Sequence, residues 1–104
     1  MLFSFLAGAL IVGLVGAAVV GCLAWIASEL EETALEIKTA NPGISTVAGE
    51  IKKKYRSGDF NRVKVGLYAI DEENEEVYEA GSVTVECEEE FDDDVEVGKI
   101  FEIA

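Results

Sequence analysis

The chain has 104 residues and a formal net charge of -13, from 21 acidic and 8 basic side chains, and it contains no histidine. A chain of about 100 residues has room for one modest domain. The excess of acid disfavours nucleic acid as a partner, because carboxylates repel phosphates, and no serine or cysteine has a plausible base near it. We therefore expect a non-enzymatic protein with no catalytic residue, cofactor or metal site.

The first segment in the chain is apolar, and Met1 to Ser28 contains no charged side chain. A bilayer core about 30 Å thick needs about 20 helical residues, and the run from Leu2 to Ile26 exceeds that length. The sequence predicts a single transmembrane helix over residues 1–27. A lipoprotein anchored at Cys22 is the alternative, because the preceding Val-Val-Gly fits the loose pattern of a lipobox.

Small residues recur every four positions inside this apolar segment. They are Ala9, Gly13, Ala17 and Gly21. In lipid, helices associate through close van der Waals contact, and a stripe of small residues lets two backbones approach. The pattern is similar to a glycine zipper. It predicts a homo-oligomer or contact with another transmembrane helix, although glycine and alanine are also simply common in such helices.

The distribution of basic residues predicts the sidedness of the chain. No lysine or arginine precedes Lys38, so every base lies on the C-terminal side of the apolar segment. Basic residues favour the cytoplasmic side of a membrane. We expect a single-pass membrane protein whose C-terminal domain is cytoplasmic.

The segment after the membrane helix is predicted to be a helical stalk and turn, over residues 28–43. Apolar residues follow at spacings of three and four, which is the period of one helical face. They are Leu23, Ile26, Leu30, Ala34 and Ile37. This stripe could form a coiled-coil seam between copies or pack on the domain of its own chain. Asn41-Pro42-Gly43 then predicts a turn.

Residues 44–104 are expected to form a small acidic α+β domain that begins with a second helix. The apolar positions from Ile44 to Tyr55 match one helical face, with Glu50 four residues before Lys54. Four bases would then lie at the end of this helix, where cations complement its dipole. They are Lys52, Lys53, Lys54 and Arg56. They are also candidates for contact with membrane lipid or a protein partner.

The remaining residues alternate with period two and predict an antiparallel meander of three to four strands packed on the second helix. Val63 to Ala69 is the first strand, and a polar turn from Asp71 to Glu76 follows. Val77 to Glu86 is the second strand, interrupted by a bend or bulge at Gly81, and Val95 to Ile103 is the third. The predicted fold class is therefore α+β, with an N-terminal transmembrane helix.

The acidic residues between the last two strands are nearly consecutive. They are Glu88, Glu89, Glu90, Asp92, Asp93 and Asp94. They lack the alternating ligands and turn glycine of a calcium loop, so a solvated loop is expected. Residues 52–64 carry six bases against one acid, whereas residues 71–104 carry 15 acids against one base. Such opposite charges can meet within one chain or between copies, where a head-to-tail contact would order an oligomer, and the excess acid also suits a basic protein partner.

These features lead to three functional hypotheses. The first is a membrane-anchored, non-enzymatic interaction or assembly protein that associates through its small-residue helix face and presents the acidic domain. The second is a structural subunit of a filament or particle, because an apolar N-terminal helix followed by a small sheet resembles type IV pilins in outline. The chain has no glutamate near the start of the helix and no basic leader, so no family is assigned. The third is a small membrane-active effector, pore-forming or holin-like.

Overall fold

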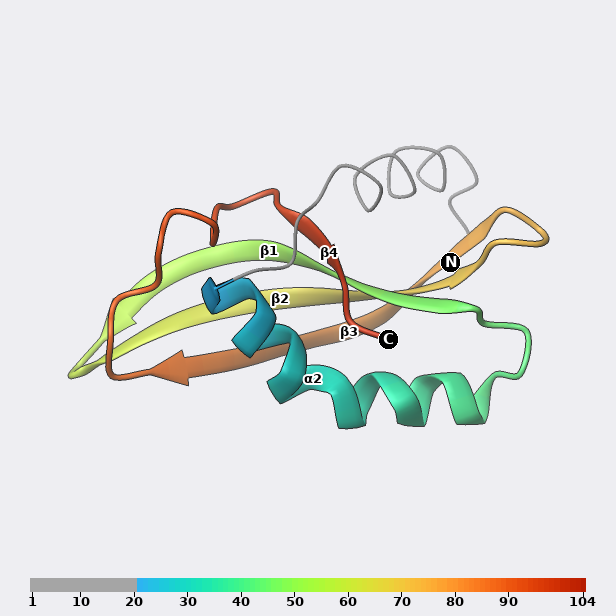
Figure 1. Cartoon of the computed structure of the whole chain (residues 1–104), viewed down its shortest axis with the longest axis horizontal. Coiled ribbons are helices and arrows are strands. Elements are labelled where there is room, and N and C mark those ends of the chain that lie inside the picture. The colour runs from blue at the N-terminus through green and yellow to red at the C-terminus, as the bar shows by residue number, and fades with distance from the viewer. Residues whose placement is uncertain (1–20) are drawn as a thin grey trace.

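A computed structural model of the chain describes residues 21–104 as an α+β fold (Figure 1). One helix packs on a four-stranded antiparallel sheet of order β3-β2-β1-β4. The elements are α2 (Gly21–Ala40), β1 (Thr46–Ser57), β2 (Phe60–Asp71), β3 (Glu76–Cys87) and β4 (Ile100–Glu102). Within residues 21–104, no helix has the length and apolar character needed to cross a membrane. Most of the predicted transmembrane helix, with Ala9, Gly13 and Ala17, lies outside the described residues.

Residues 28–40, which are predicted to be helical, belong to helix α2, which buries its apolar stripe against the sheet of its own chain. Leu23, Ile26 and Leu30 are at most 2% exposed, and they contact buried residues of the sheet. The stripe therefore packs on its own domain and is not free to form a coiled-coil seam. The helix ends at the predicted turn, where the side-chain amide of Asn41 donates to the Ile37 carbonyl over 2.9 Å.

The predicted second helix over Ile44 to Tyr55 is wrong, because these residues belong mainly to strand β1. This strand has β2 on one side and β4 on the other. Val47 and Ala48 are both fully buried although their side chains point to opposite faces. A strand that is covered on both faces loses its alternating pattern and shows consecutive buried residues. The apolar residues in this segment are spaced like those of a helix, but the spacing reflects a central strand that is buried on both faces.

The predicted strand over Val63 to Ala69 and the polar turn after it are confirmed. Strand β2 joins β1 through a tight turn at Gly58, whose φ of 62° suits a residue without a side chain. It joins β3 through residues 72–75. Both hairpins are long, and each strand has 12 residues. The β1–β2 hairpin therefore extends well beyond the three-residue strand β4.

A β-bulge in β3 confirms the predicted irregularity at Gly81 and changes which residues share a face. The partners change from Gly66–Ser82 to Tyr68–Glu79, which leaves one extra residue on β3. Val77 therefore packs on the face opposite to Val85, although the two residues have the same parity in the sequence. A second irregularity lies in β1, between Ile51 and Lys53.

The C-terminal strand lies in a different place from the one expected of a meander. Strand β4 pairs with β1, at the edge of the sheet away from β3 (Figure 1). The predicted run from Val95 to Ile103 contributes only three strand residues. Gly98 forms a turn with φ of 93°, and its amide donates to the Ile51 carbonyl over 2.8 Å. The segment before β4 must therefore cross one end of the sheet.

The sheet has two faces of different character, which we call the helix face and the second face. The helix face, against α2, holds the larger core, with Ile51, Val65 and Phe101 fully buried. The second face points away from α2. Near the β2–β3 turn it carries a smaller buried cluster of Ala48, Tyr68, Ile70 and Val77. Towards the tip of the β1–β2 hairpin the second face becomes polar and exposed.

Candidate functional site

The four predicted contact bases lie on strand β1 and not at a helix end. Their side chains project from both faces of the strand. Lys54 pairs with Val63 of the helix face, and its ammonium donates to the Val95 carbonyl over 2.8 Å. The Arg56 Nε donates to the Gly58 carbonyl within the turn over 3.4 Å. Lys52 and Lys53 lie on the second face. The strand therefore separates a group that the helical interpretation had brought together.

Lys53 meets a lysine from the neighbouring strand on the second face. Lys64 is its direct partner in the β1–β2 register, and Thr84 of β3 follows in the same line. We call these three residues the lysine row. Lys64 is exposed between Val63 and Val65, which are buried in the helix-face core, so it must project from the other face. All three residues of the row are exposed.

The lysine row carries two like charges directly opposite each other, an arrangement that destabilises a sheet. Among residues 21–104, the ion pairs are those of Lys52 with Glu50 and of Arg62 with Glu86, so neither Lys53 nor Lys64 has a carboxylate partner there. The Lys53 ammonium lies 4.9 Å from the centre of the Tyr55 ring, a cation–π contact. The row is thus a local excess of positive charge on a strongly acidic chain.

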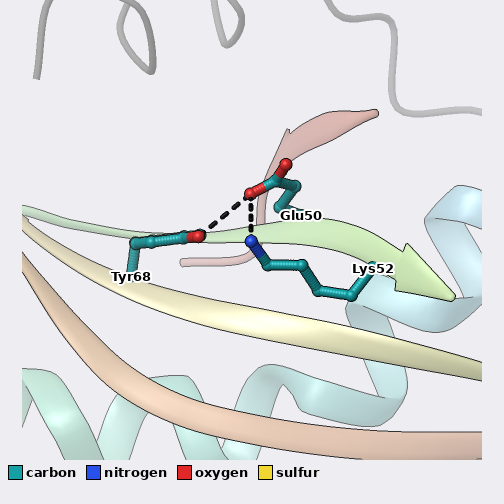
Figure 2. A network of polar contacts seen from close by, with 3 residues as sticks. All are labelled: Glu50, Lys52 and Tyr68. Atoms are coloured by element: carbon teal, nitrogen blue, oxygen red, sulfur yellow. Dashed lines mark hydrogen bonds and ion pairs between the residues drawn. The ribbon is translucent and has the colours of Figure 1, made fainter. Parts of the chain in front are cut away.

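Lys52, which precedes Lys53 in the chain, forms a polar network with Glu50 and Tyr68 (Figure 2). The carboxylate of Glu50 lies 2.8 Å from the Lys52 ammonium and accepts a hydrogen bond of 2.9 Å from the Tyr68 hydroxyl. The ammonium also lies 5.4 Å from the centre of the Tyr68 ring. The hydrogen bond to Glu50 is the main reason that the pKa of Lys52 is raised above its ordinary value. Lys52 therefore stays charged, and its charge is largely compensated.

A shallow hollow beside the lysine row has two glycines, Gly66 and Gly81, in its lining. A Cβ at Gly66 would lie 2.8 Å from the Lys52 Cε, so the lysine stem lies across this glycine. The hollow has a volume of about 330 Å³. Its lining includes Lys52, Lys64, Tyr68, Glu79, Gly81 and Ser82. It mixes both signs of charge with hydroxyl groups, which suits a polar peptide or side-chain contact better than an apolar ligand.

The acidic loop, residues 88–94, lies on the other side of the sheet from the lysine row. Its Phe91 packs against the helix-face core, and the Glu89 carbonyl accepts a 3.0 Å hydrogen bond from the Asn61 side chain. All six of its carboxylate residues are exposed. Among residues 21–104, no group of three or more potential ligands is arranged to hold a metal ion. The loop therefore presents its charge outward.

One member of the acidic loop fixes the start of helix α2. The Asp92 carboxylate accepts a 3.2 Å hydrogen bond from the backbone amide of Cys22. The same bond is the main reason that the pKa of Asp92 lies below its ordinary value. An acidic group in this place satisfies a free helix amide and complements the helix dipole. Asp92 therefore links the loop before β4 to the first turn of α2.

Gly21, the last member of the predicted helix contact, lies at this same point. Its φ is 58°, and a Cβ placed on it would lie 2.6 Å from the Asp92 Oδ2. Gly21 therefore has a local requirement for glycine that does not depend on any contact between helices. The structure brings Lys52 and Lys53 to one face, whereas it brings Gly21 together with the acidic loop. The other three members of the small-residue stripe are outside the described residues.

The sequence interpretation missed Lys64 as a member of the site. The alternation of Val63, Lys64 and Val65 predicts a strand with Lys64 on the face opposite to the two valines. The missing information was the pairing of β2 with β1, which places Lys64 opposite Lys53. Comparisons with protein-family models, with curated proteins and with solved structures gave no match to this chain.

Proposed function

We propose that the protein is a membrane-anchored, non-enzymatic assembly protein. Its apolar N-terminal segment inserts into a bilayer and associates with the same segment of other copies, while the acidic domain makes protein contacts beside the membrane. The proposal is carried by one observation on the sequence, the uncharged apolar run that leads directly into the folded domain. A basic protein is a further candidate partner, because the domain holds every charged residue of a chain of net charge -13.

The position of helix α2 refines the limits of the proposed anchor. Leu23 and Ile26, at the end of the apolar run, are fully buried in the core of the domain and are needed there. We therefore place the anchor at residues 2–20. As a helix, these about 19 residues would span about 28 Å, which is close to the thickness of a bilayer core. Gly21 would then mark the change from anchor to domain.

Membrane flotation of the full chain tests the anchor. The variant Leu10→Asp with Leu14→Asp places two charges near the middle of the segment, where each costs about 3 kcal/mol in a bilayer. We expect the wild type to float with membranes after alkaline washing and the variant to remain at the bottom of the gradient. Leu35→Asp is the matched control, because Leu35 is 48% exposed on α2 and the substitution should leave flotation unchanged. A wild type that washes off the membranes would refute the anchor.

Crosslinking in mild detergent tests association through the small-residue stripe. Gly13→Leu with Ala17→Leu would hold the helices apart and should shorten the ladder of crosslinked species. Ala7→Leu with Ala18→Leu is the control, because it adds comparable bulk at positions outside the stripe. Gly21→Leu is unsuitable, since its backbone and its contact with Asp92 would be disturbed in the domain itself. An unchanged ladder in the double variant would contradict the proposed helix contact.

A filament subunit is the second candidate function. It is favoured by the way α2 follows the apolar segment and lies along a four-stranded antiparallel sheet (Figure 1). Such an arrangement lets apolar segments gather in a core while the domains remain outside. Negative-stain electron microscopy of protein extracted without detergent would show filaments if this function holds. Discrete particles of uniform size would exclude it.

A further inference from the structure

We propose that the lysine row of one copy binds the acidic loop of a second copy, so that the domains associate head to tail. The occupant of the second face is thus residues 88–94 of a neighbouring chain. This inference deepens the self-association proposed above, but it concerns the domains and not the apolar segments. It is carried by the unpaired charges of the row, the exposed carboxylates of the loop and the opposite placement of the two.

The fold keeps the row and the loop of one chain apart. Lys53 and Lys64 project from the second face, while Phe91 anchors the loop to the helix-face core. The sheet lies between them. Lys54 borders the loop beside Glu90 and Phe91, but it belongs to the helix face, and its ammonium donates to the Val95 carbonyl. Attraction between the loop and the row can therefore be satisfied only between chains.

The charges of the two surfaces are complementary, and each is costly to leave alone. Lys53 and Lys64 repel each other across the β1–β2 ladder, and a carboxylate placed between their ammonium groups would remove that repulsion. The loop has six exposed carboxylate residues, of which Asp92 is engaged by the Cys22 amide. Contact with lysines would reduce the repulsion among the others. Thr84 within the row and Ser82 beside it add hydroxyl donors.

A second copy suits this surface better than an anionic lipid does. A lipid surface would meet the whole domain, whose excess of carboxylates would be repelled. A loop from another copy meets only the row and the hollow beside it. The contact uses different surfaces on the two chains, so each bound copy still offers a free row and a free loop. The domains would form a ring if the rotation closes and a filament if it does not.

Charge reversal on each side separates this contact from other causes of association. The face variant is Lys53→Glu with Lys64→Glu, and the loop variant is Glu88→Lys with Glu89→Lys. Each full-length variant, alone in detergent, should associate at least about tenfold more weakly than the wild type in sedimentation velocity. An equimolar mixture should associate more strongly than either variant alone, because the unchanged loop of the face variant meets the unchanged row of the loop variant, and the lysines introduced in the loop can meet the glutamates introduced in the face. A chain with all four changes should also associate.

Matched controls change the same charges elsewhere. Lys38→Glu with Lys99→Glu and Glu31→Lys with Glu36→Lys alter net charge by the same amounts but leave the row and loop intact. Their association should match the wild type. Each variant should keep the thermal unfolding transition of the wild type, which excludes misfolding as the cause. Raising the salt concentration should weaken the wild-type contact.

Three outcomes would overturn the inference. One is wild-type association of both variants alone, and another is a mixture that fails to recover. The third is a face variant that self-associates normally but loses binding to vesicles containing phosphatidylserine, which would assign the row to lipid. The measurements should be repeated with Gly13→Leu and Ala17→Leu present. Recovery in the mixture of those chains would uphold the domain contact even if the proposed anchor contact fails.

Discussion

The two faces of the sheet differ in composition and in the role that we propose for each. The helix face is apolar, and its central residues are fully buried beneath α2. Towards the hairpin tip, the second face carries exposed charges, and two lysines lie directly opposite each other. A sequence selected for stability alone would favour opposite charges or β-branched residues at that pair. Under the proposal above, binding uses the polar part of the second face, while the helix face and the smaller buried cluster serve folding, and substitutions can test this division.

Phe101→Ala should produce the largest loss of stability. Phe101 is fully buried, and it belongs to the short strand β4 that closes the helix-face core. Removing a buried aromatic ring costs about 3–5 kcal/mol, which is a large part of the stability of so small a domain. Urea unfolding followed by the fluorescence of Trp25 would measure it. Thr84→Ala on the exposed second face is the control. Equal losses of unfolding free energy in the two variants would show that the helix face contributes no more to stability than the second face.

Gly49→Val should have the next largest effect, because this buried glycine has core side chains close to it. A Cβ there would lie 2.8 Å from the Val65 Cγ1 and 2.9 Å from the Phe101 Cζ. Overpacking of this kind costs about 1–3 kcal/mol. Gly43→Ala is a suitable control, since its Cβ would meet only Asp71 at 3.5 Å. A Gly49→Val protein as stable as the control would show that neighbouring side chains such as Val65 and Phe101 can move to accept the added atoms.

Lys53→Glu should stabilise the isolated domain while weakening association. It replaces a repulsive pair with an attractive one opposite Lys64, a change of about 0.2–1 kcal/mol. The gain should shrink as salt is added, because the pair is exposed. Lys38→Glu provides the control for net charge. Loss of both stability and association in Lys53→Glu would mean that the second face also supports folding.

The smallest effect should come from titration of Asp92. Its pKa in the folded protein is lowered below the ordinary value of 3.8, chiefly by the amide of Cys22. Its stabilising contribution is therefore complete above about pH 4 and is lost as the pH falls through the lower folded value. The stability of Asp92→Asn should depend less on pH in that acidic range, as thermal melts at pH 2–5 would show. An unchanged pH profile would indicate that Asp92 does not hold the helix.

The α+β class, the helix before the domain and the alternation in β2 could be predicted from the sequence. The pattern Val63, Lys64, Val65 has one buried face and one exposed face, so its period is clear. Strand β1 was mistaken for a helix because both of its faces are buried near Val47 and Ala48, and a strand of that kind has no period of two. The burial comes from neighbouring elements, which local sequence does not contain.

The candidate site was predicted only in part, for a related reason. Lys52 and Lys53 were identified, but their grouping with Lys54 and Arg56 followed from the wrong helix. Lys64 joins them through a pairing between strands that are separated in sequence. Val77 and Val85 have the same parity in the sequence but lie on opposite faces, because the bulge at Gly81 exchanges the faces within β3. Register and bulges are properties of pairs of strands, so a single segment does not reveal them.

The left-handed backbone of Gly21 affects how a rotation about the axis of helix α2 is passed along the chain. In a continuous helix, each residue inserted turns everything beyond it by about 100°. A residue with φ of 58° interrupts that rotation, and the Asp92 contact holds the first turn of α2 in place independently. The angular position of a residue before Gly21 therefore need not match that of the apolar stripe on α2. Insertions of one or two residues immediately before Gly21 should change the distance between the proposed anchor and the domain more than they change the fold of the domain.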